Sequence, residues 1–169
     1  MNQFEAIFQG KAAKEFAATL QSMSPEEKEN LSWQEKAFLS AEERSAFAKN
    51  AVVEFNGRKF KCAPFTLGLY VDMAEAMAIP SNEEKLKACM NLILVGVGPT
   101  DKLYMKGEMY TDMRNVGEDP EQFTQAMNVR GAVDFFSVNC MRTGAALVKS
   151  APDLADKIIA ATDPKRKKK

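Results

Sequence analysis

The sequence predicts a mainly α-helical protein, a helical bundle with one small β-hairpin at about residues 52–62. Two observations lead to this fold class. Apolar residues recur at helical spacing in several segments, and Ser-x-x-Glu capping boxes, which start helices, precede many of them. One stretch in the middle of the chain instead alternates apolar and charged residues on both sides of an Asn-Gly pair, as a tight hairpin does.

The predicted hairpin carries apolar side chains on one face and charged side chains on the other. The alternating residues are Val53, Glu54 and Phe55 before the turn, and Lys59, Phe60, Lys61 and Cys62 after it. Asn56 and Gly57 both tolerate the positive φ that a type I′ turn requires. Pro64 then ends the ladder, and Thr66 can cap a helix that begins at Leu67. Because an isolated hairpin is marginal in water, this one is expected to rest on helices or on another chain.

The composition is that of a soluble globular protein, with 46% apolar and 27% charged residues in a chain of 169. This length suits one domain with a substantial core. Basic and acidic residues both number 23, so the zero net charge gives no global attraction to nucleic acid or to an anionic membrane. No apolar run approaches the ~20 residues that a spanning helix needs, and no secretory signal is visible. We therefore expect a cytoplasmic protein without a membrane or nucleic-acid partner.

Several residue types that catalytic sites need are missing or scattered. Histidine is absent, which excludes Ser-His-Asp and Cys-His catalysis and most zinc and iron sites. Cys62, Cys89 and Cys140 are odd in number and unclustered, which is typical of buried thiols in a reducing cytosol. The sequence therefore predicts a protein that is not an enzyme and that uses no cofactor or metal.

Three short motifs have both a chemical and a structural interpretation, and the structural one is favoured each time. Residues 96–102 look like a phosphate loop, but the spacing is wrong, and a helix terminator fits better. Glu108 and Asp112 can share a helix face but lack a third metal ligand, so a solvated face is expected. Lys61 could lower the pKa of Cys62, although no histidine or neighbouring cysteine supports a reactive thiol.

The chain divides into three regions: a helical N-terminal arm over residues 1–50, a hairpin plus helical bundle over 51–161, and a flexible basic tail over 162–169. After a helix over residues 2–22, the arm repeats an eight-residue unit that begins at Ser24, Ser32 and Ser40. Each unit is a capping box, so we expect short separate helices. The arm either caps the core, which is the interpretation we favour, or docks onto another protein through apolar residues that include Trp33 and Phe38.

Five further helices are expected after the hairpin, over residues 67–78, 81–94, 100–116 and 121–150, and from Pro152 onward. The second half of the 81–94 helix is apolar on all sides and is predicted to lie at the centre of the core. The longest helix has one apolar stripe that includes Phe123, Met127 and Val133. Gly131 and Gly144 within it indicate close approach of a neighbour or a kink.

Candidate partner-binding residues are soft or aromatic side chains. Met105, Met109 and Met113 recur every four residues, so they form either part of the core or an adaptable groove for another protein. Phe55 and Phe60 belong to the hairpin, whose open edge could pair with a second chain. The basic tail, Lys165 to Lys169, either adds solubility, which we favour, or touches phosphates.

The layout around Phe65 resembles the tail assembly chaperones of long-tailed bacteriophages. The resemblance covers about residues 51–100 and rests on a strand, an Asn-Gly turn, a basic second strand and a proline that leads into helices. The matching residues are Asn56, Gly57, Lys59, Phe60, Pro64, Thr66 and Leu67. Such chaperones are made in two forms, the longer by ribosomal slippage near the end of the shorter, and Lys167 to Lys169 would be encoded by the A-rich codons that favour slippage.

The resemblance implies a physical role rather than a chemical one. A tail assembly chaperone covers the apolar helices of a tape-measure protein until tail-tube subunits replace it, and it forms homo-oligomers. The cytoplasm of the host cell is the implied location. Two alternatives remain open: a structural virion protein, such as a head-to-tail connector or internal component, and a nucleic-acid-binding or inhibitor module that uses the basic tail.

Overall fold

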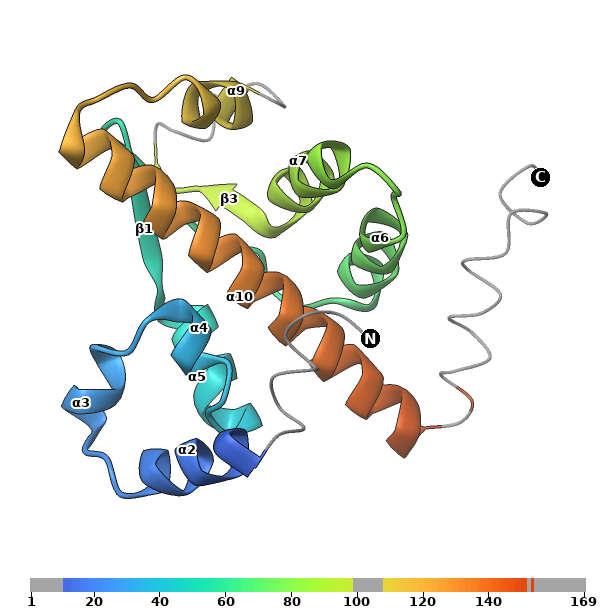
Figure 1. Cartoon of the computed structure of the whole chain (residues 1–169). Coiled ribbons are helices and arrows are strands. Elements are labelled where there is room, and N and C mark those ends of the chain that lie inside the picture. The colour runs from blue at the N-terminus through green and yellow to red at the C-terminus, as the bar shows by residue number, and fades with distance from the viewer. Residues whose placement is uncertain (1–10, 99–107, 152, 154–169) are drawn as a thin grey trace.

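The longest helix, α10 (Pro120–Ser150), is the axis on which the rest of the chain is arranged (Figure 1). The computed structural model describes residues 11–98, 108–151 and 153. Helices α6 (Leu67–Met77) and α7 (Asn82–Ile93) pack along one side of α10, and α4 (Trp33–Lys36) and α5 (Ala41–Asn50) pack along another. The remaining elements are α2 (Lys11–Gln21), α3 (Pro25–Glu29), β1 (Val52–Phe55), β2 (Arg58–Cys62), β3 (Leu94–Gly96) and α9 (Glu108–Arg114). The mainly α-helical fold class is confirmed.

The core follows the middle of α10. Val129, Val133, Phe135 and Phe136 are each at most 1% exposed, and side chains from the hairpin, α6 and α7 complete the cluster. The second half of α7 joins this core through Cys89, Met90 and Ile93, as predicted, although Leu92 is only partly buried and the most buried aromatics come from α10. A helix that passes between several neighbours buries more sides than one that lies at the periphery.

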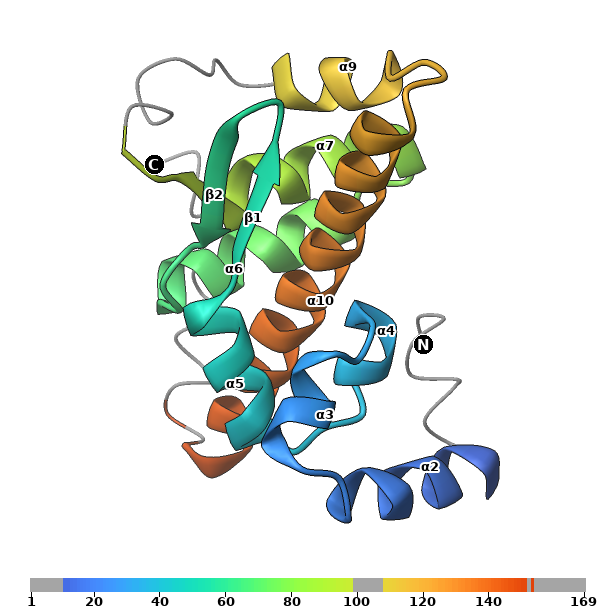
Figure 2. The same cartoon turned by 90° about the vertical axis from the view of Figure 1, so that its left-hand side faces the viewer.

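The hairpin forms where the sequence predicts it, and its turn has the expected backbone. Asn56 has φ of +52° and Gly57 has φ of +76°, so both central residues lie in the left-handed region of a type I′ turn. The strands are antiparallel, with Val53 opposite Phe60. The hairpin rests on α10 (Figure 2), and the amide of Asn56 donates a hydrogen bond to Oε1 of Gln125 on α10 at 3.1 Å.

A third strand makes the sheet larger than the sequence predicts. Leu94 to Gly96 leave the helical path after Ile93 and pair antiparallel with β2, which gives the order β1-β2-β3. The expected continuation of the α7 helix through Leu94 was therefore wrong. A short run of Leu and Val fits a buried helix or a strand equally well, and here the free edge of β2 decides between them.

The N-terminal arm is a set of short capped helices, as its repeats predict. Ser24, Ser32 and Ser40 are the N-caps of α3, α4 and α5, and each side chain accepts a hydrogen bond from the amide three residues on. At Ser32 the capping box is complete, because Glu35 also accepts from the Ser32 amide. Ala37, the C-cap of α4, is 0% exposed, and its carbonyl accepts a hydrogen bond from Arg142 on α10. The end of the arm therefore caps the core.

Some predicted elements fall wholly or partly outside the described residues. These are the first part of the helix over 2–22, most of the first half of the helix over 100–116, the helix from Pro152 and the basic tail. Within the described residues no helix is both long and apolar enough to cross a lipid bilayer.

Candidate protein-docking groove

A shallow groove of about 300 Å³ lies between α9 and the first turns of α10, two helices that Figure 2 shows at the same end of the molecule. Its lining comes from three helices. From α7 comes Leu86; from α9 and the turn after it come Tyr110, Met113, Arg114 and Val116; from α10 come Phe123, Ala126, Met127 and Arg130. The lining is mostly apolar, and an arginine stands on each of the two helices that form its walls.

The start of α10 is fixed by its cap, and this sets the direction of the exposed side chains. Oδ1 of Asp119 accepts a hydrogen bond from the amide of Glu121 at 3.0 Å, and Pro120 occupies the first turn, where its missing N–H costs nothing. Phe123, Met127 and Arg130 then follow at spacings of four and three, so they share one helix face. Phe123 is 57% exposed and Met127 is 58% exposed.

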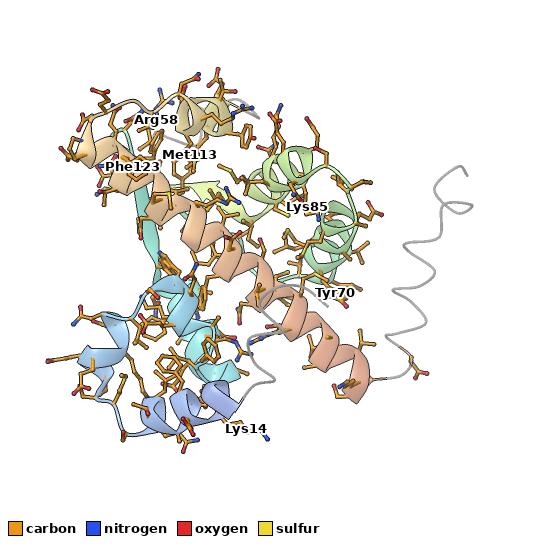
Figure 3. The ribbon with its side chains drawn as sticks, in the orientation of Figure 1. Lys14, Arg58, Tyr70, Lys85, Met113 and Phe123 are labelled. Carbon is orange, nitrogen blue, oxygen red and sulfur yellow. The ribbon has the colours of Figure 1, made fainter. Side chains whose placement is uncertain are left out.

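The other wall, α9, is held in place from two sides. Met109 is 8% exposed and belongs to the core cluster, so it anchors α9 to the body of the protein. Arg114 at the end of α9 donates a hydrogen bond from its guanidinium to Oε1 of Glu83 at 2.6 Å, and this ion pair links α9 to the start of α7. Met113, one turn after Met109, lies between the core and the groove. Figure 3 labels Met113 and Phe123 on the two walls.

The charged residues that line the groove are both arginines, and each pairs with a carboxylate outside the lining, Glu83 or Asp134. The described lining includes Arg114 and Arg130, whose side chains are 62% and 55% exposed, and no acidic residue. Asp134, one turn beyond Arg130, has its carboxylate 3.9 Å from the guanidinium Nε. Burial raises the pKa of Asp134, and the charge of Arg130 opposes that rise. An apolar groove with exposed guanidinium groups suits an apolar helix face that is flanked by carboxylates.

The structure divides the predicted methionine stripe. Met109 is a core residue and Met113 lines the groove, whereas Met105 lies outside the described residues. Met109 is therefore a core residue, whereas a partner-binding role for Met113 stays a prediction.

Trp33 packs the N-terminal arm on α10, and Phe38 packs two parts of the arm on each other. The Trp33 ring lies 5.3 Å from the ring of Phe135, and its Nε1 donates a hydrogen bond to Oδ1 of Asn128 at 2.9 Å. The Phe38 ring meets the ring of Phe16 edge-on at 5.2 Å. Both predicted partner residues thus have partners within the chain.

Phe55 and Phe60 are core residues in this structure. They are 0% and 5% exposed, and both belong to the same cluster as the α10 aromatics. Alternation in a strand predicts which face is apolar, but the helix that packs on that face decides whether it is free. Neither ring offers a surface to a second protein in this conformation.

The sequence suggested no partner role for Phe123, Met127, Arg114 or Arg130. The sequence predicts Phe123 and Met127 as part of the apolar stripe of α10, but the buried residues nearby are Ala126, Val129 and Val133. Two apolar stripes therefore run along the start of this helix, each with helical spacing. The signal in the sequence was that the apolar surface at the start of α10 is wider than one packed neighbour can cover, which indicates an exposed apolar face.

The chemical interpretations of the short motifs gain no support. Burial raises the pKa of Cys62 to about 12, which is opposite in direction to activation by Lys61. Gly96 belongs to β3 and Gly98 has φ of +67°, so the described part of this segment ends a strand and the predicted helix terminator was wrong; residues 99–102 lie outside the described residues. Glu108 and Asp112 are exposed on α9. Among the described residues, no three His, Cys, Asp or Glu side chains gather as metal ligands would.

Comparison of the chain with protein-family models, with curated proteins and with solved structures gave no match. The groove and its chemistry are therefore the basis on which we infer a function.

Proposed function

We propose that this chain is a non-enzymatic phage assembly protein, a tail assembly chaperone that shields the apolar helices of a tape-measure protein. The observation that supports the proposal is the exposure of Phe123 and Met127 beside the groove. Large apolar side chains that gather at a groove mark interaction sites more often than scattered ones do. Methionine adapts its shape to different neighbours, which suits a partner whose sequence varies along its length.

We propose that the groove binds successive turns of an amphipathic helix, whose apolar face lies in the groove. Helices dock into such grooves through residues at positions i, i+3, i+4 and i+7. Arg114 and Arg130 on the two walls favour acidic residues at the edges of that face. Modest depth and exposed charges keep such binding reversible, as replacement by tail-tube subunits requires.

The test is coexpression with the tape-measure protein that the proposal expects to be encoded near this gene. The variant Phe123→Ser with Met127→Ser removes the apolar contacts, and the matched control is Val52→Ser with Leu147→Ser, which removes two exposed apolar side chains elsewhere. We expect the tape-measure protein to stay soluble and to copurify with the wild type and the control, but to aggregate with the groove variant. Equal solubility with all three proteins would overturn the proposal, as would the absence of a tape-measure gene nearby.

We also propose reversible self-association in the cytoplasm of the host cell, which keeps the groove covered before the tape-measure protein is made. Sedimentation velocity over a range of concentrations tests this part. Concentration-dependent oligomers that dissociate when an acidic amphipathic helix is added are the expected result. A fixed ring that persists at high dilution would favour the structural virion protein instead.

A further inference from the structure

A second and larger cavity lies on a different part of the molecule and shares no residue with the docking groove. It has a volume of about 490 Å³ and is lined by residues of α5, the end of β2, the start of α6 and the middle of α10. Figure 2 labels these elements. Pockets that hold small molecules have volumes of about 300–1,000 Å³ and mostly apolar walls with a few polar groups. This cavity has both properties.

The walls of the cavity are apolar on three sides. Its apolar surface is formed by Leu69 of α6, Ile93 of α7 and Phe136 of α10. Phe65, in the segment between β2 and α6, also lines the cavity. Ile93 and Phe136 are at most 1% exposed, so the inner wall belongs to the rigid core. Such a surface takes an aliphatic or aromatic body and excludes a strongly hydrated one.

The charged residues that line the cavity are all basic. Lys49 on α5 and Lys61 on β2 both border the cavity, and its lining contains no aspartate or glutamate. Both lysines are exposed, so their ammonium groups stay in water while their stems follow the wall. An anionic group at the mouth would meet two cations without being fully desolvated.

The inner wall also holds a polar atom without a partner. Oδ1 of Asn139 on α10 is buried and accepts no hydrogen bond in the described structure. Leaving such an acceptor unpaired costs free energy. Core packing alone does not explain an asparagine at this point, because an apolar side chain would fill the wall without that cost.

We propose that this cavity binds a small amphiphilic anion, with its apolar body against Leu69, Ile93 and Phe136 and its carboxylate or phosphate at Lys49 and Lys61. The cavity thereby gives the protein a ligand site that is separate from the docking groove. Two free thiols, Cys62 and Cys140, also line the cavity, and although burial raises the pKa of both and makes them slow to react, a further slowing reports that the cavity is occupied.

The test uses three probes that share a ten-carbon chain: decanoate, decanol and decyltrimethylammonium. The full chain is incubated with each probe below its micelle concentration, and alkylation of Cys62 and Cys140 by a small maleimide is followed by mass spectrometry. Binding is also measured by calorimetry. We expect decanoate to slow alkylation of both thiols and to bind at least tenfold more tightly than decanol, with no protection by the cation.

The variant Lys49→Glu with Lys61→Glu tests the charge of the mouth, and Lys14→Glu with Lys149→Glu is a control with the same change in net charge. The control lysines are exposed and lie outside the cavity lining, as Figure 3 shows for Lys14 on α2. Decanoate affinity should fall at least tenfold in the mouth variant and stay within twofold in the control. Circular dichroism confirms that both variants are folded. Unchanged affinity in the mouth variant, or equal protection by all three probes, would overturn the proposal.

Discussion

The ring of Tyr70 on α6 lies directly over the Cα of Gly144 on α10. A Cβ built at Gly144 would overlap the ring carbons Cδ2, Cε2 and Cγ of Tyr70. The two helices approach so closely because position 144 has no side chain. The sequence indicated this glycine as a point of close approach or a kink, and close approach is the interpretation that the structure confirms.

Gly144→Ala is therefore expected to destabilise the protein although alanine is the better helix former. Alanine gains about 1 kcal/mol in helix propensity, but overpacking of this kind costs about 1–3 kcal/mol, and the rigid ring of Tyr70 leaves little room for relief. We expect a net loss of up to about 2 kcal/mol in urea unfolding.

Gly68→Ala is the matched control for Gly144→Ala. This glycine is also helical, and its nearest atom to a built Cβ is Thr66 Oγ1 at 3.8 Å, an ordinary contact. Gly68→Ala should leave stability equal or higher. If Gly144→Ala were as stable as Gly68→Ala, the close packing of Tyr70 on Gly144 would be refuted.

The turn of the hairpin yields a prediction that depends on backbone conformation alone. Gly57 has φ of +76°, and a Cβ built there meets nothing within 4 Å. Gly57→Ala is expected to cost about 1–2 kcal/mol, because an L side chain in the left-handed region is strained even in open space. Asn56→Gly, at φ of +52°, should be tolerated. Thermal unfolding of the two variants, compared with the wild type, separates strain from loss of packing.

Local chemistry explains which parts of the fold the sequence predicts. The Asn-Gly turn, the serine N-caps and the ends of α6 and α10 depend on residues within a few positions of one another, and all of these predictions were confirmed. The third strand was missed because Leu94 pairs with Cys62, more than thirty positions earlier. Local sequence determines what a segment can form, whereas the free edge of a distant strand determines what it does form.

The candidate site was harder to predict for a related reason. Phe55 and Phe123 are equally apolar in sequence, yet one is 0% exposed and the other 57% exposed. Exposure depends on which of the two stripes of α10 the hairpin covers, and sequence spacing does not reveal that choice. Arg114 and Arg130 come together across two helices, and their shared groove exists only in the folded chain.

Glu43 provides a test of stability against pH. Its Oε2 accepts a hydrogen bond from Nζ of Lys28 at 2.7 Å, and this hydrogen bond is the main cause that lowers the pKa of Glu43 below its usual value of 4.5. A lowered pKa in the folded state stabilises the protein above the unfolded pKa, and this contribution is lost as the pH falls through the folded pKa. Glu43→Gln should therefore be less stable than the wild type at pH 7, by about 1 kcal/mol or less, since the pair is partly exposed.

Urea unfolding at pH 7 and at pH 3 measures the effect of Glu43→Gln. The difference from the wild type should shrink at the lower pH, where the carboxylate begins to take up a proton. Glu42→Gln on the same helix is the control, because Glu42 is exposed and adjacent to Glu43. A difference that is independent of pH would contradict the assigned role of the Lys28–Glu43 pair.

Asp134, near the docking groove, should behave in the opposite way. Burial raises its pKa above the usual 3.8, and the nearby charge of Arg130 offsets only part of this. A raised pKa means that the folded state binds the proton more tightly, so ionised Asp134 lowers stability above the folded pKa. Asp134→Asn should therefore be more stable than the wild type at pH 7, and the gain should vanish as the pH falls below about 3.8. Unfolding curves at pH 7, 5 and 3.5 follow this change, and a loss of stability at pH 7 would show that the Arg130 pair outweighs burial.

The last prediction concerns how much the apolar residues of the core and those of the groove each contribute to stability. Phe123→Ser with Met127→Ser removes side chains that are more than half exposed, and surface changes of this kind usually alter stability by less than about 0.5 kcal/mol each. Phe55→Ala removes a fully buried ring and should cost about 3–5 kcal/mol. Urea unfolding of both variants measures the contrast. If the groove variant were also strongly destabilised, Phe123 and Met127 would be structural, and loss of tape-measure binding in that variant would no longer indicate a docking role. A groove variant that is as stable as the wild type and fails to bind would instead assign these two side chains to partner recognition.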